Sequence, residues 1–120
     1  MKTTTKDSSD FERIVSDGES ASLIYLHRNE LHLILNIYGR MVAAGLWKDY
    51  AIDTLKDEAI FSIFKHATEM PTYRIIKQPS IAQKQGAWRI TSMSGQIIKR
   101  GKDLAALLRY FDKFTLKIVD

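Results

Sequence analysis

The chain of 120 residues contains no cysteine. Disulfide bonds, thiolate nucleophiles and zinc sites built from cysteine are therefore excluded, and the absence fits a reducing compartment. Long apolar runs are missing as well. The longest, residues 41–47, is far shorter than the ~20 residues that a membrane-spanning helix needs. Residues 1–10 are polar and lack the apolar core of a signal peptide. We therefore expect a cytoplasmic protein without disulfides and without a membrane partner.

Carboxylates are absent from one stretch of the chain. Between Met70 and Lys102 there is no Asp or Glu, although this stretch holds seven Lys or Arg residues. The rest of the chain has eleven Lys or Arg against fourteen Asp or Glu, a sum of −3, so the formal net charge of +4 comes from residues 70–102. We call residues 70–102 the basic segment and predict that it contacts an acidic protein, another anion or nucleic acid, unless it is only a solvated surface. The candidate contact residues are Arg74, Lys77, Lys84, Arg89, Lys99 and Arg100.

The composition predicts one folded domain preceded by a flexible tail. Hydrophobic residues make up 45% and charged residues 27% of the sequence, which suits a single core. Residues 1–20 are mostly polar, and Phe11, Ile14 and Val15 bury too little apolar surface to offset the entropy lost on ordering. We assign residues 1–20 to a flexible tail, whose removal should leave the fold intact, and residues 21–120 to a single α+β domain.

A short apolar run at residues 22–27 predicts a strand. The residues after it have helical periodicity and predict a helix. Asn29 is expected to cap the helix, and Gly45 to end it in a left-handed conformation. Leu33 and Ile37 lie off the core stripe and widen the apolar arc of this helix. We therefore predict self-association into a homodimer through these two residues, unless the N-terminal segment folds back over them. The core stripe consists of Leu31, Ile34, Leu35, Tyr38, Met41 and Val42.

Gly39 lies inside this predicted helix. A glycine there costs ~1 kcal/mol relative to alanine. We expect close packing of the helix on a sheet to be the reason for it.

Period-two patterns then predict a meander of strands. Residues 58–66 are apolar on both faces, which predicts a central strand covered on both sides. The connections are too short for parallel crossovers, so the fold class is α+β, with a mainly antiparallel sheet of four or five strands flanked by an N-terminal and a C-terminal amphipathic helix. The second helix is expected to begin near Asp103, followed by a terminal strand or ordered tail at residues 115–119. The other predicted strands are residues 48–54, 72–78, 87–93 and 96–100, with a short connection at residues 80–86.

A turn at residues 94–95 marks a hairpin inside the basic segment. With a two-residue turn Arg89 faces Arg100, and with a three-residue turn it faces Lys99. Both registers place like charges opposite each other, at a cost of a few tenths to ~1 kcal/mol. A bound anion or a nearby carboxylate would offset this cost. A four-residue turn would avoid the pair, because Arg89 would then face Ile98.

Two aromatic residues of the basic segment, Tyr73 and Trp88, neighbour Arg74 and Arg89. Aromatic and cationic side chains together suit stacking on bases and neutralisation of phosphates. Neighbours in a strand point to opposite faces, so the alternative is that the aromatic rings belong to the core and only the cations are exposed.

No catalytic, metal-binding or nucleotide-binding motif is present in the sequence. The three histidines, His27, His32 and His66, lack the spacing that places two metal ligands on one helical face. Asp49 and Asp53 would stand about 13 Å apart on one strand, too far for paired catalytic carboxylates. No metal ion or cofactor is therefore predicted.

The sequence favours a non-enzymatic binding or regulatory module over an enzyme. The alternative is a small enzyme whose site is assembled by the fold rather than written in a motif. Convergence of the candidate side chains on one cleft, with perturbed pKa values, would favour the enzyme. These candidates are Arg40, Asp49, Tyr50, Asp53 and His66.

Several short motifs are specific enough to compare with known families. They are Tyr38-Gly39-Arg40-Met41-Val42-Ala43-Ala44-Gly45, Trp47, Asp49-Tyr50-Ala51-Ile52-Asp53, Phe61-Ser62-Ile63-Phe64, Tyr73-Arg74-Ile75, Gln85-Gly86-Ala87, Ile98-Lys99-Arg100-Gly101 and Asp103-Leu104. With these motifs, the chain resembles an uncharacterised family of small alphaproteobacterial proteins described only as a domain of unknown function. The resemblance covers about residues 29–114. It implies a bacterial cytoplasmic protein and transfers no catalytic residue.

Overall fold

The computed structural model of the chain describes residues 23–66 and 70–119. The predicted flexible tail, residues 1–20, lies outside the described residues. So do Phe11, Ile14 and Val15.

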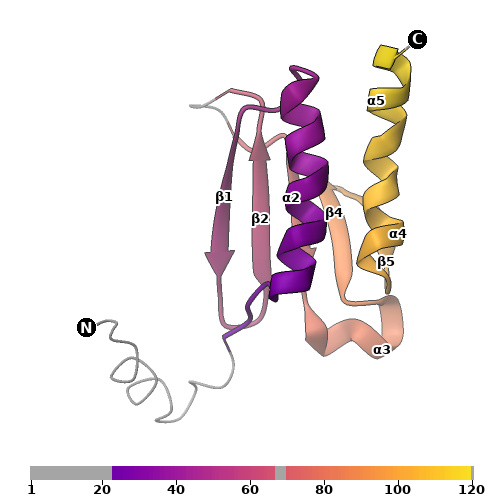
Figure 1. The fold of residues 1–120 in the computed structure, drawn as a ribbon. Coiled ribbons are helices and arrows are strands. Elements are labelled where there is room, and N and C mark those ends of the chain that lie inside the picture. Colours follow the sequence, from indigo (N-terminus) through magenta and orange to yellow (C-terminus); the bar gives the residue numbers. More distant parts are fainter. Residues whose placement is uncertain (1–22, 67–69, 120) are drawn as a thin grey trace.

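Five strands form one antiparallel sheet in the order β1-β2-β3-β4-β5, so each strand pairs with its neighbours in the sequence (Figure 1). Helix α2, Arg28–Ala43, precedes the sheet, and a C-terminal helical segment follows it. The predicted α+β meander is therefore confirmed. The strands are β1 Asp49–Thr54, β2 Ala59–Phe64, β3 Tyr73–Lys77, β4 Trp88–Ser92 and β5 Ile97–Gly101. The other helices are η2 Pro79–Ile81, α3 Ala82–Gln85, α4 Leu104–Leu108, η3 Arg109–Phe111 and α5 Asp112–Val119.

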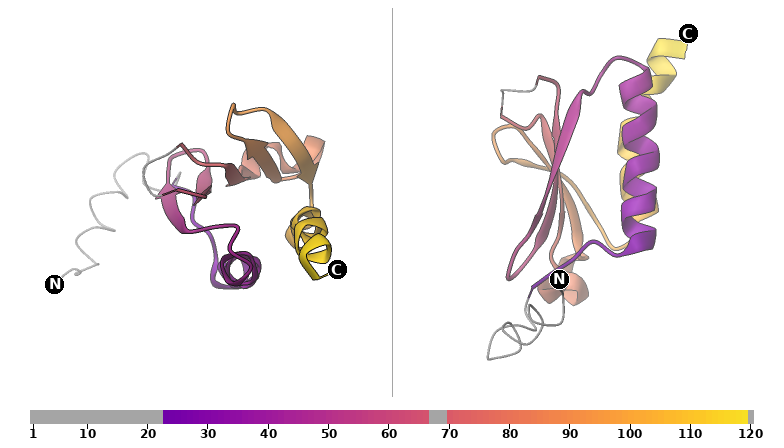
Figure 2. Two further views of the ribbon diagram at one scale, coloured as in Figure 1. Left: turned by 90° about the horizontal axis from the view of Figure 1, so that it is seen from above. Right: turned by 60° about the vertical axis from the view of Figure 1, so that its left-hand side comes forward.

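Helix α2 and the C-terminal helices α4 and α5 lie on the same side of the sheet (Figure 2). The main core lies between them and the sheet, because alternate residues of the strands point toward the helices. The buried residues of this core are Ile34, Met41, Trp47, Phe61, Ile63, Ile75, Trp88, Ile90, Leu104, Leu107, Leu108 and Phe111. We call this side of the sheet the inner face, and the opposite side the outer face.

The cover of β2 differs from the prediction. Its residues are apolar on both faces, but in the described part of the chain the helices cover only the inner face (Figure 2). On the outer face, Ile60 and Phe64 are partly exposed, whereas Ser62 between them is buried. Side chains of neighbouring strands can shield a residue within a sheet without a further layer. Apolarity on both faces therefore did not require a second layer of helices.

Helix α2 begins two residues earlier than predicted. Its N-cap is His27, whose backbone N–H donates to Glu30 Oε1 at 2.8 Å, so the predicted cap residue Asn29 lies inside the helix. The predicted end is confirmed: Gly45 has φ +80°, and its N–H donates to the carbonyl of Val42 at 2.9 Å. The N–H of Leu46 donates to the Met41 carbonyl at 2.9 Å, which completes a Schellman motif.

Two terminal predictions were wrong. Residues 23–27 form no strand, and a single backbone bond from the Ile24 N–H to the Leu55 carbonyl, 2.8 Å, joins them to the β1–β2 turn. Residues 115–119 belong to helix α5 rather than to a strand. Their alternating pattern is too short to decide between the two structures, and the preceding helix continues through them.

The hairpin of β4 and β5 pairs Arg89 with Arg100, which is the register predicted for a two-residue turn. The loop, however, is longer than two residues. The loop has three residues, 93–95, closed by the Ser92 N–H donating to the Gln96 carbonyl at 2.9 Å. Thr91 pairs with Ile97 but Ile90 pairs with Lys99, so Ile98 is an extra residue in β5. This β-bulge shifts the register by one residue and restores the arginine pair.

Gly39 does not have the predicted packing role. It is exposed on α2, and a Cβ built there would meet nothing within 4 Å. We expect Gly39→Ala to stabilise the fold by about 0.5–1 kcal/mol, because alanine lowers the entropy of the unfolded chain and favours the helix. Denaturant unfolding would measure the change. A destabilised variant would show that the surface of α2 at Gly39 is covered in solution.

Candidate functional site

Three arginines of the basic segment share the outer face of the sheet. Arg89 pairs with Arg100 on one side and with Ile76 on the other, so all three residues point to one face. Arg74 lies two residues from Ile76 on β3 and points the same way. We call Arg74, Arg89 and Arg100 the outer-face arginines. They occupy three adjacent strands, on the side that the described helices leave uncovered (Figure 2).

The outer-face arginines differ in their contacts. Arg89 is held in place, because its guanidinium donates to Gln78 Oε1 at 2.7 Å and to Glu58 Oε1 at 3.1 Å. Glu58 is therefore the nearby carboxylate that offsets the repulsion between Arg89 and Arg100. The ion pairs among the described residues do not include Arg74 or Arg100. Arg100 is exposed and Arg74 is half-buried.

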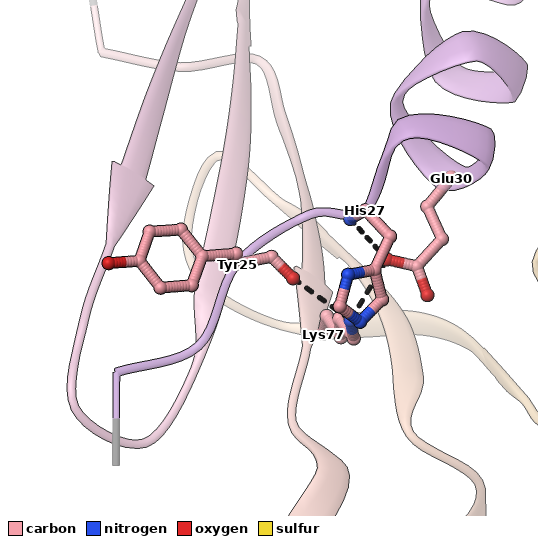
Figure 3. A network of polar contacts seen from close by, with 4 residues as sticks. All are labelled: Tyr25, His27, Glu30 and Lys77. Carbon is pink, nitrogen blue, oxygen red and sulfur yellow. Dashed lines mark hydrogen bonds and ion pairs between the residues drawn. The ribbon is translucent and has the colours of Figure 1, made fainter. Parts of the chain in front are cut away.

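Lys77 lies apart from these arginines. It occupies every second position of β3 together with Tyr73 and Ile75 and therefore points, as they do, to the inner face, where it is only 8% exposed. Its ammonium donates to Glu30 Oε1 and to the Tyr25 carbonyl, both at 2.9 Å (Figure 3). This network ties the start of α2 to β3. Lys77 thus belongs to the core of the fold, and the period-two pattern of β3 was the signal that placed it there.

The remaining candidate cations are dispersed. Lys99 pairs with Ile90, so the register assigns it to the inner face, at the edge strand β5, where it is exposed. Lys84 is exposed on the short helix α3. Neither shares the face of the outer-face arginines. The six candidate contact residues are therefore divided between two faces of the sheet and a connecting helix.

The aromatic residues of the basic segment lie under the helices. Trp88 is buried in the main core, and Tyr73 packs against that core with its ring 5.2 Å from the ring of Phe111. Lys77 Nζ lies 6.0 Å from the centroid of the Trp88 ring, on the same inner face. The described structure therefore offers no exposed pairing of these rings with the outer-face arginines.

The candidate enzymatic residues do not converge on one cleft. Arg40 forms an ion pair with Asp112 across the two helical segments, at 3.1 Å. Tyr50 points to the inner face and stacks on Phe61 at 4.8 Å between ring centroids. Asp49 and Asp53 occupy alternate positions of β1 that point to the outer face, on the other side of the sheet. His66 is exposed beyond the end of β2.

The displaced pKa values belong to tyrosines of the core region. Burial, followed by the nearby charge of Asp49, raises the pKa of Tyr38, and burial followed by Tyr110 raises the pKa of Tyr73. Desolvation disfavours the phenolate, so these shifts follow from packing. In the described part of the chain, no three His, Asp or Glu residues are grouped as metal ligands would be. No helix there is long and apolar enough to cross a membrane.

A groove of about 460 Å³ runs between α2 and the C-terminal helices. Leu33 and Ile37, the residues predicted to mediate self-association, line it together with Arg40 of the enzymatic alternative. No local sequence pattern predicts that these residues meet the C-terminal helices, because that contact depends on tertiary packing. The residues contributed by the C-terminal helices are Ala105, Leu108, Arg109 and Asp112.

A family model described as "Protein of unknown function (DUF2794)" matches residues 24–108. The chain belongs to this family. The predicted membership in a family of unknown function is confirmed, whereas the alphaproteobacterial origin stays a prediction. The DUF2794 match covers all five strands and hence the outer-face arginines, and it ends at Leu108, before Asp112 of the groove. No curated protein and no solved structure gives a significant match to the chain.

Proposed function

We propose that this DUF2794 protein is a bacterial cytoplasmic binding module, without enzymatic activity, whose outer face contacts an acidic region of a protein partner. The observation that carries the proposal is the position of Arg74, Arg89 and Arg100 on adjacent strands of the face that the described helices leave uncovered. Arginine forms forked hydrogen bonds with carboxylates, and a row of such groups favours a partner with several acidic side chains. Arg89 is already oriented by Glu58 and Gln78, so less entropy is lost when it binds.

A buried hydroxyl also supports the outer face as the binding surface. Thr91 points outward between Arg74 and Ile97, and its Oγ1 has no hydrogen-bond partner among the described residues. Buried polar atoms nearly always have a hydrogen-bond partner. A binding partner that contacts the outer face would explain this exception. The apolar residues Ile60 and Phe64, which are partly exposed on that face, would add contact area.

Two other functions receive less support. Nucleic-acid binding through stacking would need exposed aromatic rings, but Tyr73 and Trp88 pack on the inner face. A fold-assembled enzyme would need its candidate groups in one cleft, but Asp53 and Tyr50 lie on opposite faces of the sheet. Single-stranded nucleic acid remains a useful second probe for the experiment below.

We expect the double variant Arg74→Ala, Arg100→Ala to bind poly-L-glutamate about tenfold more weakly than the unmodified protein, because each lost cation removes a charge-assisted contact. Fluorescence anisotropy at about 50 mM and about 200 mM salt would measure both the affinity and its salt dependence.

The matched control is Lys48→Ala, Lys84→Ala, which removes the same charge from exposed positions outside the outer face. Equal losses for both double variants would mean that only net charge matters, and would contradict the proposal. Tighter binding of a single-stranded oligonucleotide than of poly-L-glutamate would assign the face to nucleic acid instead.

A further inference from the structure

The groove between the helices has the same pattern on both walls. Leu33, Asn36, Ile37 and Arg40 of α2 are spaced i, i+3, i+4 and i+7. The four lining residues of the C-terminal helices, between Ala105 and Asp112, repeat this spacing. The α2 wall is therefore a two-turn stripe, about 10 Å long at 1.5 Å per residue. The opposite wall runs from α4 through the 3-10 turn η3 to the start of α5. Two parallel stripes of this kind form the groove into which the ridge of a third helix packs.

The base of the groove is apolar and its rim is cationic. Leu108 is buried and Ile37 half-buried, whereas Leu33 is 36% exposed and so offers apolar surface to a ligand. Arg40 and Arg109 are exposed, against the single carboxylate of Asp112, which already pairs with Arg40 at 3.1 Å. Other exposed charged residues on the same helices or next to them are the cations Arg28, Lys102 and Lys113 and the carboxylate Asp103. A complementary ligand is therefore apolar along one side and acidic along its edges.

Two occupants from this chain itself fit less well. A second copy would bring its own Arg40 and Arg109 against the same cations, because a two-fold contact places like patches together. The N-terminal segment has acidic residues but only a few apolar ones, which bury too little surface to offset the cost of ordering it. The charge of the rim favours a separate acidic partner.

We propose that the groove between α2 and the C-terminal helices binds an acidic amphipathic helix of another protein. The apolar stripe of that helix contacts Leu33, Ile37 and Leu108, and its flanking carboxylates contact Arg109 and Arg40. This site is on the opposite side of the molecule from the outer-face arginines, so it goes beyond the binding proposed above. The two sites can be lost independently.

The probe is a labelled helical peptide of about four turns, with leucines spaced i, i+3, i+4 and i+7 and flanked by glutamates. Its control has the same leucines flanked by lysines. We expect the full chain to bind the acidic peptide at least tenfold more tightly than the basic one. Leu33→Gln should weaken this binding about tenfold, and Arg109→Glu should reverse the preference toward the basic peptide. Val42→Gln is the matched control, because Val42 is also exposed on α2, at 41%, but does not line the groove.

Four results would overturn the proposal. The first is that the acidic peptide does not bind at millimolar concentration, and the second is that Val42→Gln weakens binding as much as Leu33→Gln. The third is a dimer in sedimentation equilibrium that Leu33→Gln dissociates, which would assign the groove to a second copy. The fourth is a tenfold gain in peptide affinity for the full-length variant Phe11→Ser, Ile14→Ser, which would assign it to the N-terminal segment. Variants of Arg74 and Arg100 should leave peptide binding unchanged, so failure here and failure of the outer face are distinguishable.

Discussion

Gly86→Ala is expected to destabilise the protein by about 4 kcal/mol or more. Gly86 has φ +86° and ψ 149°, a backbone region that only glycine adopts without strain. The backbone strain of an alanine there accounts for about 1–3 kcal/mol of the expected loss. A Cβ at this position would also overlap the Gly101 carbonyl and lie 2.8 Å from the Lys102 nitrogen. These are backbone atoms at the end of β5, so relief requires the α3–β4 connection to move away from the sheet.

Gly95→Ala is the matched control for this prediction. Gly95 has nearly the same φ, +89°, but a Cβ there would meet nothing within 4 Å. We therefore expect a cost of about 1–2 kcal/mol, from the backbone conformation alone. Denaturant unfolding of both variants would measure the difference. Equal effects of the two substitutions would contradict the close approach of Gly86 to Gly101.

The second large effect concerns the network of Lys77 and Glu30. We expect Glu30→Ala to destabilise the fold by about 3–5 kcal/mol, because it leaves a buried ammonium without its counter-charge. The same substitution removes the acceptor for the His27 N–H at the start of α2. The remaining bond, from Lys77 Nζ to the Tyr25 carbonyl at 2.9 Å, cannot replace the carboxylate (Figure 3).

Replacement of the whole ion pair should cost much less than its disruption. Lys77→Met keeps most of the side-chain volume next to Trp88, and combined with Glu30→Gln it removes both charges. Buried ion pairs exchanged for neutral side chains are often nearly neutral for stability. We therefore expect the free energy of unfolding of this double variant to lie within about 1 kcal/mol of that of the unmodified protein. A double variant as unstable as Glu30→Ala would show that volume and hydrogen bonds, rather than charge, hold α2 to β3.

The sequence predicted the elements whose signal is local. Alternation placed Tyr50 and Ile52 opposite Asp49 and Asp53 on β1, and the register confirms this division. Gly45 ended the first helix as expected, because its left-handed φ is a property of one residue. Residues 115–119 were assigned wrongly, because five residues give too few periods to separate a strand from a helix.

The candidate surfaces depended on tertiary contacts that no local pattern contains. The basic segment is not one surface, because the alternation along β3 turns Lys77 inward, away from Arg74 and Arg89. The pairing of Arg89 with Arg100 required an extra residue at Ile98, which turn rules alone did not predict. Leu33 and Ile37 are unusual for a helix that packs on one side only. The opposite wall of their groove is contributed by residues 105–112. It depends on the side-by-side packing of the helices, which no local pattern predicts.

The most direct test of the binding module is a chemical-shift map of the full-length protein titrated with poly-L-glutamate. We expect the largest amide shifts along β3, β4 and β5 at Arg74, Arg89 and Arg100, with shifts that decrease as salt screens the contact. Poly-L-glutamate lacks an apolar stripe, so the groove residues Leu33 and Ile37 should shift little. Shifts concentrated on α2 and the C-terminal helices, or spread evenly over exposed cations such as Lys48 and Lys84, would contradict the assignment of binding to the outer face.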